Sequence, residues 1–571
     1  MGTGLRGRTG AYSACSRETF QNHLTPNGRP EAKRQNGVTL TEIPQLHTCA
    51  NGERRLMVDG RPFTLLAGEC HNSASGGRRA FADALDRAQW LGMNTVLAPV
   101  TWELLEPAEG KYDFWQLDMM LELARERGLH LGVLWFGAYK NAQCYYAPAW
   151  VKRDVRRFRR AQMVPGQNKI IYEEFYGFAI TALSLFCPET LEADALAYAA
   201  LMAHLRDVDG AEHTVVTVQV ENECGQMVAA REHDAWADAA FAQEVPPALV
   251  EALRADPSAM APEVLAALEA GVGAGTWEQV FGEHAEELFT TYHMARYVEQ
   301  VAAAGRAEYA LPTACNCWLD KGHKPGRFPT GGPNLRVLGV WKHAAPSIDM
   351  VGPDIYVPTF CQVCEGYTRP DNLLFIPETA THAYAAAREI WAVGHLHAFC
   401  FSPFGYEEMG EPFGDSAGIL FGMDTSDPAL RTPQDPGEYA AVTRGLARLL
   451  EMAADDAAYA TLDAVSSEVS AKGELCMGGV VIKVSFAEGA LPGACAALVG
   501  ADGAVYLLAL RCALALESRV AGEPHVDVDA LETGTVENGT WQRDCRLNGD
   551  EVGIMRCDEP TLLRLTTITY A

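Results

Sequence analysis

The stretch Thr217-Val-Gln-Val-Glu-Asn-Glu223 decides the fold. Residues 215–220 are typical of a strand that is covered on both faces, as in a parallel sheet. This strand ends abruptly in Glu221, Asn222 and Glu223. Polar side chains at the end of a buried strand are costly unless they line a site, and in an eight-stranded βα barrel the site lies at this rim. The alternative is a polar strand end that faces a loop.

Length and charge restrict the class of protein. The chain has 571 residues, of which 48% are hydrophobic, and a formal net charge of -28. This length suits one barrel of roughly 250 to 400 residues together with a smaller domain. The negative charge argues against nucleic acid or an anionic membrane surface as a partner and suits a neutral ligand.

The N-terminus is rich in Gly, Arg, Ser and Asn and lacks the apolar core of a secretory signal. No stretch of the sequence reaches the ~20 apolar residues of a membrane span. We therefore expect residues 1–38 to be a mobile extension of a cytoplasmic protein that has no membrane partner. The sequence leaves the oligomeric state open, and a homo-oligomer is one option.

Strand-like runs alternate with helical runs through most of the chain, which is the pattern of a (β/α)8 TIM barrel. The predicted strands are residues 63–68, 94–100, 129–135, 215–220, 311–317, 348–355, 373–376 and 398–401. We expect the barrel to occupy residues 39–455 and to carry a helical insertion at about 229–284. From residue 456 to 571 short alternating runs split by Gly and Pro predict an all-β, sandwich-like accessory domain.

The 16 cysteines are scattered through predicted strands and helices, which favours reduced, buried side chains. Two close pairs exist, Cys315 with Cys317 and Cys361 with Cys364, and their role in metal binding or redox chemistry stays open. We predict no metal and no organic cofactor.

A glutamate lies at the C-terminal end of each of two predicted strands. Glu223 follows the fourth predicted strand, and Glu378 follows the seventh, Leu373-Leu-Phe-Ile-Pro377. These strands lie across the barrel mouth from one another. A retaining glycosidase needs two carboxyl groups roughly 5 to 5.5 Å apart, one as acid/base and one as nucleophile. A salt-bridged strand end is the alternative for Glu378.

Several motifs resemble glycoside hydrolase family 35. They are Gln219-Val-Glu-Asn-Glu-Cys-Gly225, Leu66-Ala-Gly-Glu-Cys-His-Asn72, and Ala98–Pro107 followed by Gly110–Phe114, a pattern that family 42 shares. The C-terminal segment resembles the small β domain of a bacterial subgroup of family 35-like proteins. The resemblance runs from about Leu56 to the end and implies a retaining β-galactosidase of clan A.

The resemblance also implies roles for individual residues. Glu223 would be the acid/base and Glu378 the nucleophile. Asn222 would hold the sugar 2-hydroxyl, and Tyr356 would donate a hydrogen bond that keeps the nucleophile ionised. Glu221 points to the opposite face of the strand, where we expect a structural ion pair.

Other polar and aromatic residues at predicted strand ends are candidates for sugar contact. They are His71, Asn72, Glu103, Asn141, Asn316 and Trp318. We expect one of Trp102, Trp135 and Trp318 to be a stacking platform for the sugar.

One position departs from the family pattern. Many family 35 enzymes have Asn-Ala-Glu after the third strand, where this chain has Asn141-Ala-Gln143. An amide at this position still forms hydrogen bonds but carries no charge. The resemblance therefore supports the glycosidase reaction more strongly than it supports selectivity for galactose. We expect hydrolysis of terminal β-D-galactosides, with a small carbohydrate as substrate. Alternatives are another clan A activity (β-glucosidase, α-L-arabinopyranosidase or β-fucosidase), a catalytically silent sugar-binding barrel, or a metal-dependent barrel hydrolase, which would need clustered His residues.

Overall fold

The computed structural model describes residues 42–49, 52, 54–172, 178–412, 431–453, 455–489 and 491–571. The extension predicted at residues 1–38 lies outside these residues. Glu42–Ala571 form one compact unit. Within the described part of the chain, no helix is both long and apolar enough to cross a lipid bilayer.

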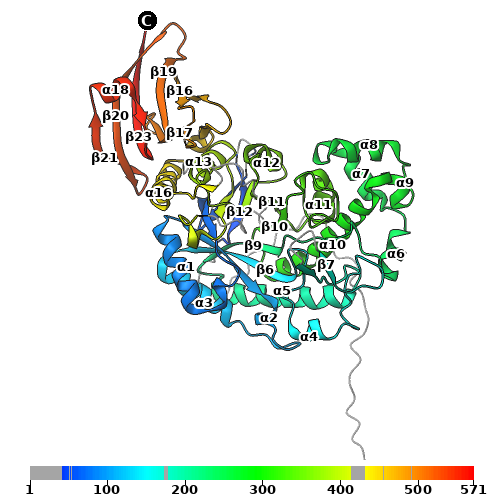
Figure 1. The fold of residues 1–571 in the computed structure, drawn as a ribbon. Coiled ribbons are helices and arrows are strands. Elements are labelled where there is room, and N and C mark those ends of the chain that lie inside the picture. Colours follow the sequence, from blue (N-terminus) through cyan, green and yellow to red (C-terminus); the bar gives the residue numbers. More distant parts are fainter. Residues whose placement is uncertain are drawn as a thin grey trace, which may run out of the picture. The chain divides into compact units, whose positions relative to one another are not determined.

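A closed barrel of eight parallel strands forms the centre of the described chain (Figure 1). The strands are β4 (Leu65–Glu69), β5 (Thr95–Thr101), β6 (His130–Lys140), β9 (Val215–Asn222), β10 (Thr313–Trp318), β11 (Met350–Ile355), β12 (Phe375–Thr379) and β13 (Cys400–Pro403). Every residue of β5 and β9 is buried, as expected for strands covered on both faces. The predicted (β/α)8 barrel is therefore confirmed, and each predicted strand overlaps an observed one.

Helices follow the strands and surround them (Figure 1). They are α1 (Arg78–Trp90), α3 (Trp115–Arg127), α5 (Pro188–Asp209), α10 (Ala285–Glu308), α11 (Leu338–Ala344), α12 (Phe360–Tyr367), α13 (Ala385–His395) and α16 (Pro436–Met452). The apolar stripe of α1 is fully buried at Phe81, Leu85 and Ala88. α3 ends at Gly128, whose φ of 64° is the left-handed conformation that ends many helices.

An antiparallel sheet precedes the barrel. Its strands are β1 (Gln45–Thr48), β2 (Arg54–Val58) and β3 (Arg61–Phe63). Asp59 and Gly60 join β2 to β3 with φ values of 51° and 71°, the conformation of a tight hairpin turn. Leu56 and Val58 pack against inward-facing apolar side chains of the barrel strands. This hairpin therefore contributes to the barrel core.

β6 is longer than predicted and ends in a bulge. Trp135 pairs with Val220 of β9 and Lys140 pairs with Asn222, so β6 advances five residues for two on β9. Short elements follow the neighbouring barrel strands: η1 (Ala74–Gly76), α2 (Trp102–Leu105), α4 (Ala149–Arg153), β7 (Ile170–Tyr172), β8 (Phe178–Ile180), η5 (Leu335–Val337) and η6 (Tyr406–Glu408). The bulge brings residues beyond Trp135 to the barrel rim, which the predicted strand end did not anticipate.

The insertion predicted after the fourth strand is helical. It contains α6 (Ala235–Phe241), α7 (Pro247–Ala255), η3 (Pro257–Ala259), α8 (Pro262–Ala270), α9 (Trp277–Phe281) and η4 (Gly282–His284). Pro247 and Pro262 occupy the first turns of α7 and α8, where the missing N–H is tolerated. Leu249, Trp277 and Phe281 belong to a separate apolar cluster within this region.

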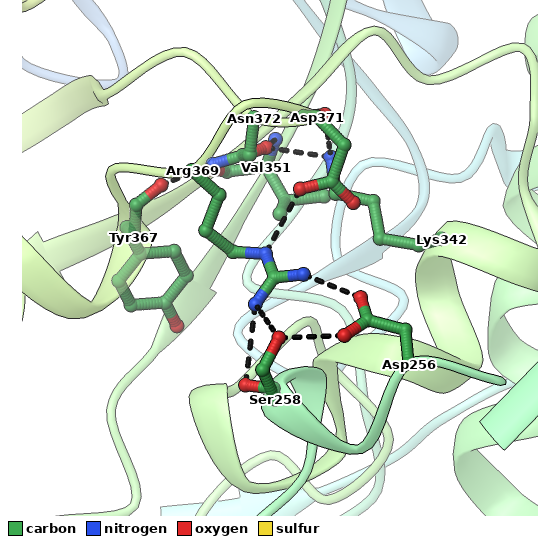
Figure 2. Close-up of polar contacts among 8 residues, drawn as sticks. All are labelled: Asp256, Ser258, Lys342, Val351, Tyr367, Arg369, Asp371 and Asn372. Atoms are coloured by element: carbon green, nitrogen blue, oxygen red, sulfur yellow. Dashed lines mark hydrogen bonds and ion pairs between the residues drawn. The ribbon is translucent and has the colours of Figure 1, made fainter. Parts of the chain in front are cut away.

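Figure 2 shows polar contacts that join this insertion to the loop after α12, and that loop to β11. Arg369, which follows α12, donates a hydrogen bond of 2.6 Å to Asp256 in the insertion. Asn372 accepts from the Val351 N–H at 2.9 Å and donates to the Val351 carbonyl at 3.0 Å. Lys342 donates to the Asn372 side chain at 2.8 Å. These contacts fix the loop that leads into β12.

The described C-terminal residues form two antiparallel sheets, ordered β14-β17-β18-β23-β20-β21 and β15-β16-β19-β22. The helix α17 (Asp456–Tyr459) precedes them, and α18 (Asp550–Ile554) lies among them. The strands are β14 (Asp463–Ser466), β15 (Lys472–Met477), β16 (Val480–Phe486), β17 (Ala494–Val499), β18 (Val505–Leu510), β19 (Cys512–Ser518), β20 (His525–Glu537), β21 (Thr540–Leu547), β22 (Arg556–Cys557) and β23 (Thr561–Tyr570).

Apolar side chains from both C-terminal sheets share one core, which includes Leu475, Ile482, Leu507 and Leu563. This arrangement confirms the predicted all-β C-terminal region and its sandwich-like character. The boundary at residues 455/456 stays a prediction.

Candidate active site

A cavity of about 330 Å³ opens at the C-terminal ends of the barrel strands. This is the end at which βα-barrel proteins carry their sites. The lining side chains are mainly amides, carboxylates and aromatic rings: Asn72, Lys140, Asn141, Gln143, Tyr145, Tyr146, Ile180, Glu223, Met227, Trp318, Asp354, Tyr356, Glu378 and Phe404. Such a mixture can hold a polar ligand that also has an apolar face.

Glu223 lies directly after β9 and is only 6% exposed. Its φ of 43° is a left-handed conformation, which is uncommon for a residue with a side chain. Asn316 accepts a hydrogen bond of 2.8 Å from the Glu223 backbone N–H, and Asn141 donates one to Oε2 of the carboxylate. Burial first, and then the charge of Glu378, raises the pKa of Glu223 to about 7. Near neutral pH this carboxyl can therefore carry a proton.

Glu378 lies in β12 and is 4% exposed. The Tyr356 hydroxyl donates a hydrogen bond of 2.8 Å to its Oε2. Oε1 has no hydrogen-bond partner among the described residues, and Glu378 is one of the residues that line the cavity. One carboxylate oxygen each of Glu378, Glu223 and Asp354 lies within 4.8 Å of the others. The two predicted carboxylates therefore face the same small space.

Asp354 is a third carboxylate at this point, and the sequence analysis missed it. It pairs with Glu378 in the β11–β12 register and accepts a hydrogen bond of 2.8 Å from Asn316 Nδ2. Burial first, and then the charges of Glu378 and Glu223, raises the pKa of Asp354 well above its usual range. The signal that could have found it is its place one residue before the end of the sixth buried strand.

Lys140 and Glu69 were also missed. Lys140 is 6% exposed, and its Nζ donates a hydrogen bond of 2.5 Å to Asn222 Oδ1. Glu69 is fully buried at the end of β4, and neither of its carboxylate oxygens has a hydrogen-bond partner in the described structure. Burial, followed by the charge of Glu378, raises the pKa of Glu69 well above its usual range. The site thus has one buried ammonium group among several carboxyl groups.

A two-residue turn places the predicted Asn141 and Gln143 at the cavity. Asn141 and Ala142 have φ values of 52° and 57°, and Lys140 and Gln143 exchange backbone hydrogen bonds of 2.8 and 3.0 Å across them. Gln143 is 6% exposed, and its Oε1 has no partner among the residues that the structure describes. An acceptor oxygen in this state is suited to a ligand hydroxyl.

Of the remaining predicted contact residues, Asn72, Trp318 and Tyr356 line the cavity. Asn222 is fully buried and contacts Lys140, which lines the cavity, and its Nδ2 has no hydrogen-bond partner within the described chain. Asn316 is also fully buried and contacts Glu223 and Asp354, so it positions acidic residues of the site.

His71, Trp102 and Glu103 do not line the cavity. His71 Nε2 lies 3.5 Å from Glu408, at the barrel surface. Trp102 begins α2, is fully buried, and donates a hydrogen bond of 2.8 Å to Glu106. The Glu103 side chain is 40% exposed and pairs with a lysine at 3.3 Å. The expected sugar contacts of His71 and Glu103 therefore find no support in the cavity lining, and Trp102 is not the platform. Trp102 and Glu103 lie on α2, and His71 follows β4.

Two further expectations concern Trp135 and Glu221, and only the second needs correction. Trp135 is fully buried and donates a hydrogen bond of 2.9 Å to Asp194, so Trp318 is the one of the three tryptophans that lines the cavity. Glu221 has a structural place, as expected, but accepts from the backbone N–H groups of Ala138 and Tyr139 at 3.2 and 2.7 Å and lies beside Asp194. The neighbour of Glu221 is thus an acidic residue and not the cation of the expected ion pair. Burial first, and then the charge of Asp194, raises the pKa of Glu221 well above its usual range.

The close cysteine pairs occupy separate places. Cys315 Sγ lies 3.9 Å from Cys224 Sγ, and Cys317 Sγ lies 3.1 Å from the Tyr367 hydroxyl. Cys361 and Cys364 lie on α12, and burial raises the pKa of Cys361 to about 12. Among the described residues, the acidic side chains close enough to share a cation are Glu223, Asp354 and Glu378.

Residues 55–164 match glycosyl hydrolases family 35. The chain is a family 35-like protein. The match covers β4 to β6 and includes Glu69, Lys140 and Gln143, whereas Glu223 and Glu378 lie beyond it. Residues 438–556 match a domain of unknown function, DUF5597, which covers α16 and most of the C-terminal strands.

Curated relatives of this family 35-like protein are distant. The chain is 43% identical over 56 residues to a β-galactosidase of Xanthomonas manihotis, which is 10% of this chain and 9% of that protein. It is 34% identical over 107 residues to a β-galactosidase of Macaca fascicularis, which is 18% of this chain and 15% of that protein. The chain thus spans less than a fifth of the length of either relative.

Solved structures similar to the family 35-like protein include a β-galactosidase from the psychrophilic Marinomonas ef1, with 13% identity, a TM-score of 0.43, and coverage of 69% of this chain and 61% of that one. They also include the exo-β-1,4-mannosidase Op5Man5 from Opitutaceae bacterium strain TAV5, with 16% identity, a TM-score of 0.37, and coverage of 68% and 60%. At these scores the function has to be argued from the site itself.

Proposed function

We propose that this protein is a retaining glycosidase in which Glu378 is the nucleophile and Glu223 the acid/base. One observation carries this proposal: the two buried carboxylates share one cavity but have opposite surroundings. Glu378 accepts a hydrogen bond of 2.8 Å from the Tyr356 hydroxyl, which restrains one oxygen of its carboxyl group. Glu223 has a pKa raised to about 7, which favours its protonated form. Double displacement needs a protonated acid beside a positioned nucleophile.

The chemistry follows in two steps. In the first step a Glu378 oxygen attacks the anomeric carbon while the glycosidic bond breaks, and the Glu223 proton passes to the leaving oxygen. In the second step Glu223 takes a proton from water, the water oxygen attacks the same carbon, and the bond to Glu378 breaks. The product keeps the anomeric configuration, and both carboxyl groups return to their starting states.

The substrate of this proposal is a terminal β-D-galactoside. The curated relatives are named β-galactosidases, and the site is rich in acids, which suits a neutral sugar better than an anionic one. Asn222 Nδ2 is the donor available for the 2-hydroxyl, and Trp318 is the aromatic platform. Related β-fucosides and α-L-arabinopyranosides are additional substrates, because Gln143 offers no charge.

Purified protein assayed on a panel of nitrophenyl glycosides tests the proposal. We expect turnover of the β-D-galactoside, loss of turnover in Glu378→Gln, and unchanged turnover in Glu122→Gln, whose exposed carboxylate pairs with Arg78. Proton NMR of the first-formed sugar should show the β anomer. An α anomer would exclude the retaining mechanism, and binding of galactose without any turnover would favour the silent sugar-binding barrel.

The cytoplasmic location and the oligomeric state stay predictions. Gel filtration with light scattering measures the second directly.

A further inference from the structure

Lys140 occupies an unusual position for a lysine. It ends the bulged strand β6 and is 6% exposed, whereas lysine is almost never so buried without partners. Its Nζ donates to Asn222 Oδ1 at 2.5 Å and lies 4.9 Å from the centre of the Phe136 ring. The ammonium group therefore has a fixed place between the ends of β6 and β9.

Carboxyl groups surround this ammonium from several strands. Four carboxyl groups interact electrostatically with it: Glu69 of β4, Glu223 after β9, Asp354 of β11 and Glu378 of β12. Two further titratable groups face these carboxyl groups: Lys321 after β10 is near Glu223, and Tyr356 after β11 is near Glu378. Burial alone would lower the pKa of Lys140, but the surrounding carboxylates outweigh burial and raise it. Lys140 is therefore charged at neutral pH.

We propose that Lys140 is a positioning residue, which orients the Asn222 amide toward the sugar and offsets the charge of the surrounding carboxylates. This inference rests on the proposed function and adds a residue to it.

The first part of the inference follows from hydrogen-bond chemistry. An ammonium group has donors and no acceptor, so it can contact only the oxygen of an amide. With Lys140 on Oδ1, the Asn222 side chain must direct Nδ2 elsewhere, and this nitrogen has no partner among the described residues. Without the ammonium group the amide could rotate by half a turn, which would present an oxygen to the sugar.

The second part follows from charge. The charge of Lys140 lowers the pKa of Glu223 and of Glu69, against the burial that raises both. A neutral side chain at this position would remove that effect, so Glu223 would keep its proton to higher pH. The alkaline limb of the pH–rate profile would then move upward.

Kinetics of three variants test both parts. We expect Lys140→Met to lower kcat/KM for the β-galactoside by on the order of 100-fold, the scale for one preorganised donor. The loss should be much smaller for the matching 2-deoxy glycoside, which has no 2-hydroxyl for Asn222 to hold. The alkaline limb should move to higher pH in Lys140→Met and return to its original place in Lys140→Arg, which keeps the charge.

Lys342→Met is the control, because Lys342 is a half-buried, hydrogen-bonded lysine that lies away from the cavity, in the network of Figure 2. It should lower the melting temperature without moving the alkaline limb. If Lys140→Met does not fold, Lys140→Gln replaces it. The introduced amide can still donate a hydrogen bond to Asn222 but carries no charge. In that variant the alkaline limb of the pH–rate profile should move, whereas the rate on the β-galactoside at low pH should change little.

Equal losses on both substrates together with an unmoved limb would show that Lys140 has only a structural role. A wild-type protein that turns over no glycoside would overturn the proposed function, and this inference with it. An active wild type with unaltered variants would overturn the inference alone.

Discussion

The Tyr356 hydroxyl donates a hydrogen bond of 2.8 Å to Glu378 Oε2 and leaves Oε1 of the same carboxylate unpartnered within the described structure. The hydroxyl thus restrains one oxygen of a residue that lines the cavity, and the other oxygen stays available. A nucleophile needs both features, since it must be charged and aimed before attack.

Removing this donor should slow the reaction. A hydrogen bond to a charged group contributes about 1.5 to 3 kcal/mol, so Tyr356→Phe should lower kcat/KM by roughly 10- to 150-fold. Tyr112→Phe is the control, because Tyr112 is 37% exposed and lies outside the cavity lining. Steady-state kinetics on the nitrophenyl β-galactoside measures both, and equal rates for the two variants would contradict the assigned role.

The pKa of Glu223 predicts the alkaline limb of the pH profile. Burial and Glu378 raise this pKa to about 7, and a general acid acts only while it is protonated. Activity should therefore be full below about pH 7 and fall as the pH rises through that value. This alkaline limb should be visible in the pH dependence of kcat/KM for an unactivated galactoside. The variant Glu223→Gln should retain a residual rate on aryl glycosides, and the pH profile of that rate should show no alkaline limb.

Glu223→Ala should distinguish substrates by their leaving groups. An aryl oxide with a low pKa leaves without protonation, whereas an alkyl or sugar oxygen needs the proton. We expect the variant to lose far more rate on lactose-like disaccharides than on activated nitrophenyl galactosides in its first step. Pre-steady-state kinetics separates that step, and equal losses on both substrates would reassign the acid.

A buried ion pair joins α13 to the loop after β14. Arg388 is 1% exposed and donates to both oxygens of Glu468, at 2.9 and 2.5 Å. Arg388→Met would leave a carboxylate without its cation, so it should lower the free energy of unfolding by about 3 to 5 kcal/mol. The double variant Arg388→Met with Glu468→Leu should recover most of that loss. Denaturant unfolding measures each, and additive losses would show that the two residues are not coupled.

The barrel could be predicted because its strands are continuous buried runs, and β9 is the clearest case. Glu223 and Glu378 could be predicted because each interrupts such a run at its C-terminal end. Asp354 and Glu69 also lie at the C-terminal ends of buried strands: Asp354 is the penultimate residue of β11, and Glu69 is the last residue of β4. Their importance depends on burial and on neighbours that only the closed barrel brings together.

Other parts of the site depend on local backbone geometry. Lys140 reaches the cavity because β6 carries a bulge. The hydrophobic pattern of the sequence does not predict such an irregular register. Trp102 was one of three candidate platforms because it follows a strand, but it begins α2 and packs edge-on against Trp150, with ring centres 6.0 Å apart. Position along the chain thus predicts which rim a residue is near, whereas side-chain direction requires the backbone conformation.

Gln143 decides how strictly the site should select galactose. Its side chain lines the cavity, and its Oε1 has no partner within the described chain, so it is available to a sugar hydroxyl. A neutral amide binds a hydroxyl about half as strongly as a carboxylate would, because the charge assists the bond. We therefore expect measurable activity on α-L-arabinopyranosides and β-D-fucosides beside β-D-galactosides.

Gln143→Glu should narrow that preference toward galactose. The new carboxylate would strengthen contact with a galactose hydroxyl by roughly 1 to 1.5 kcal/mol, the difference between a charged and a neutral acceptor, and would gain nothing where the hydroxyl is missing. It would also add a charge to a site that already holds several carboxyl groups, so the total rate should fall and the alkaline limb should move to higher pH. Ratios of kcat/KM across the three glycosides measure selectivity independently of that rate. An unchanged ratio in an active Gln143→Glu variant would show that this side chain does not read the sugar, and the assignment of Glu223 and Glu378 would stand, because it rests on other strands.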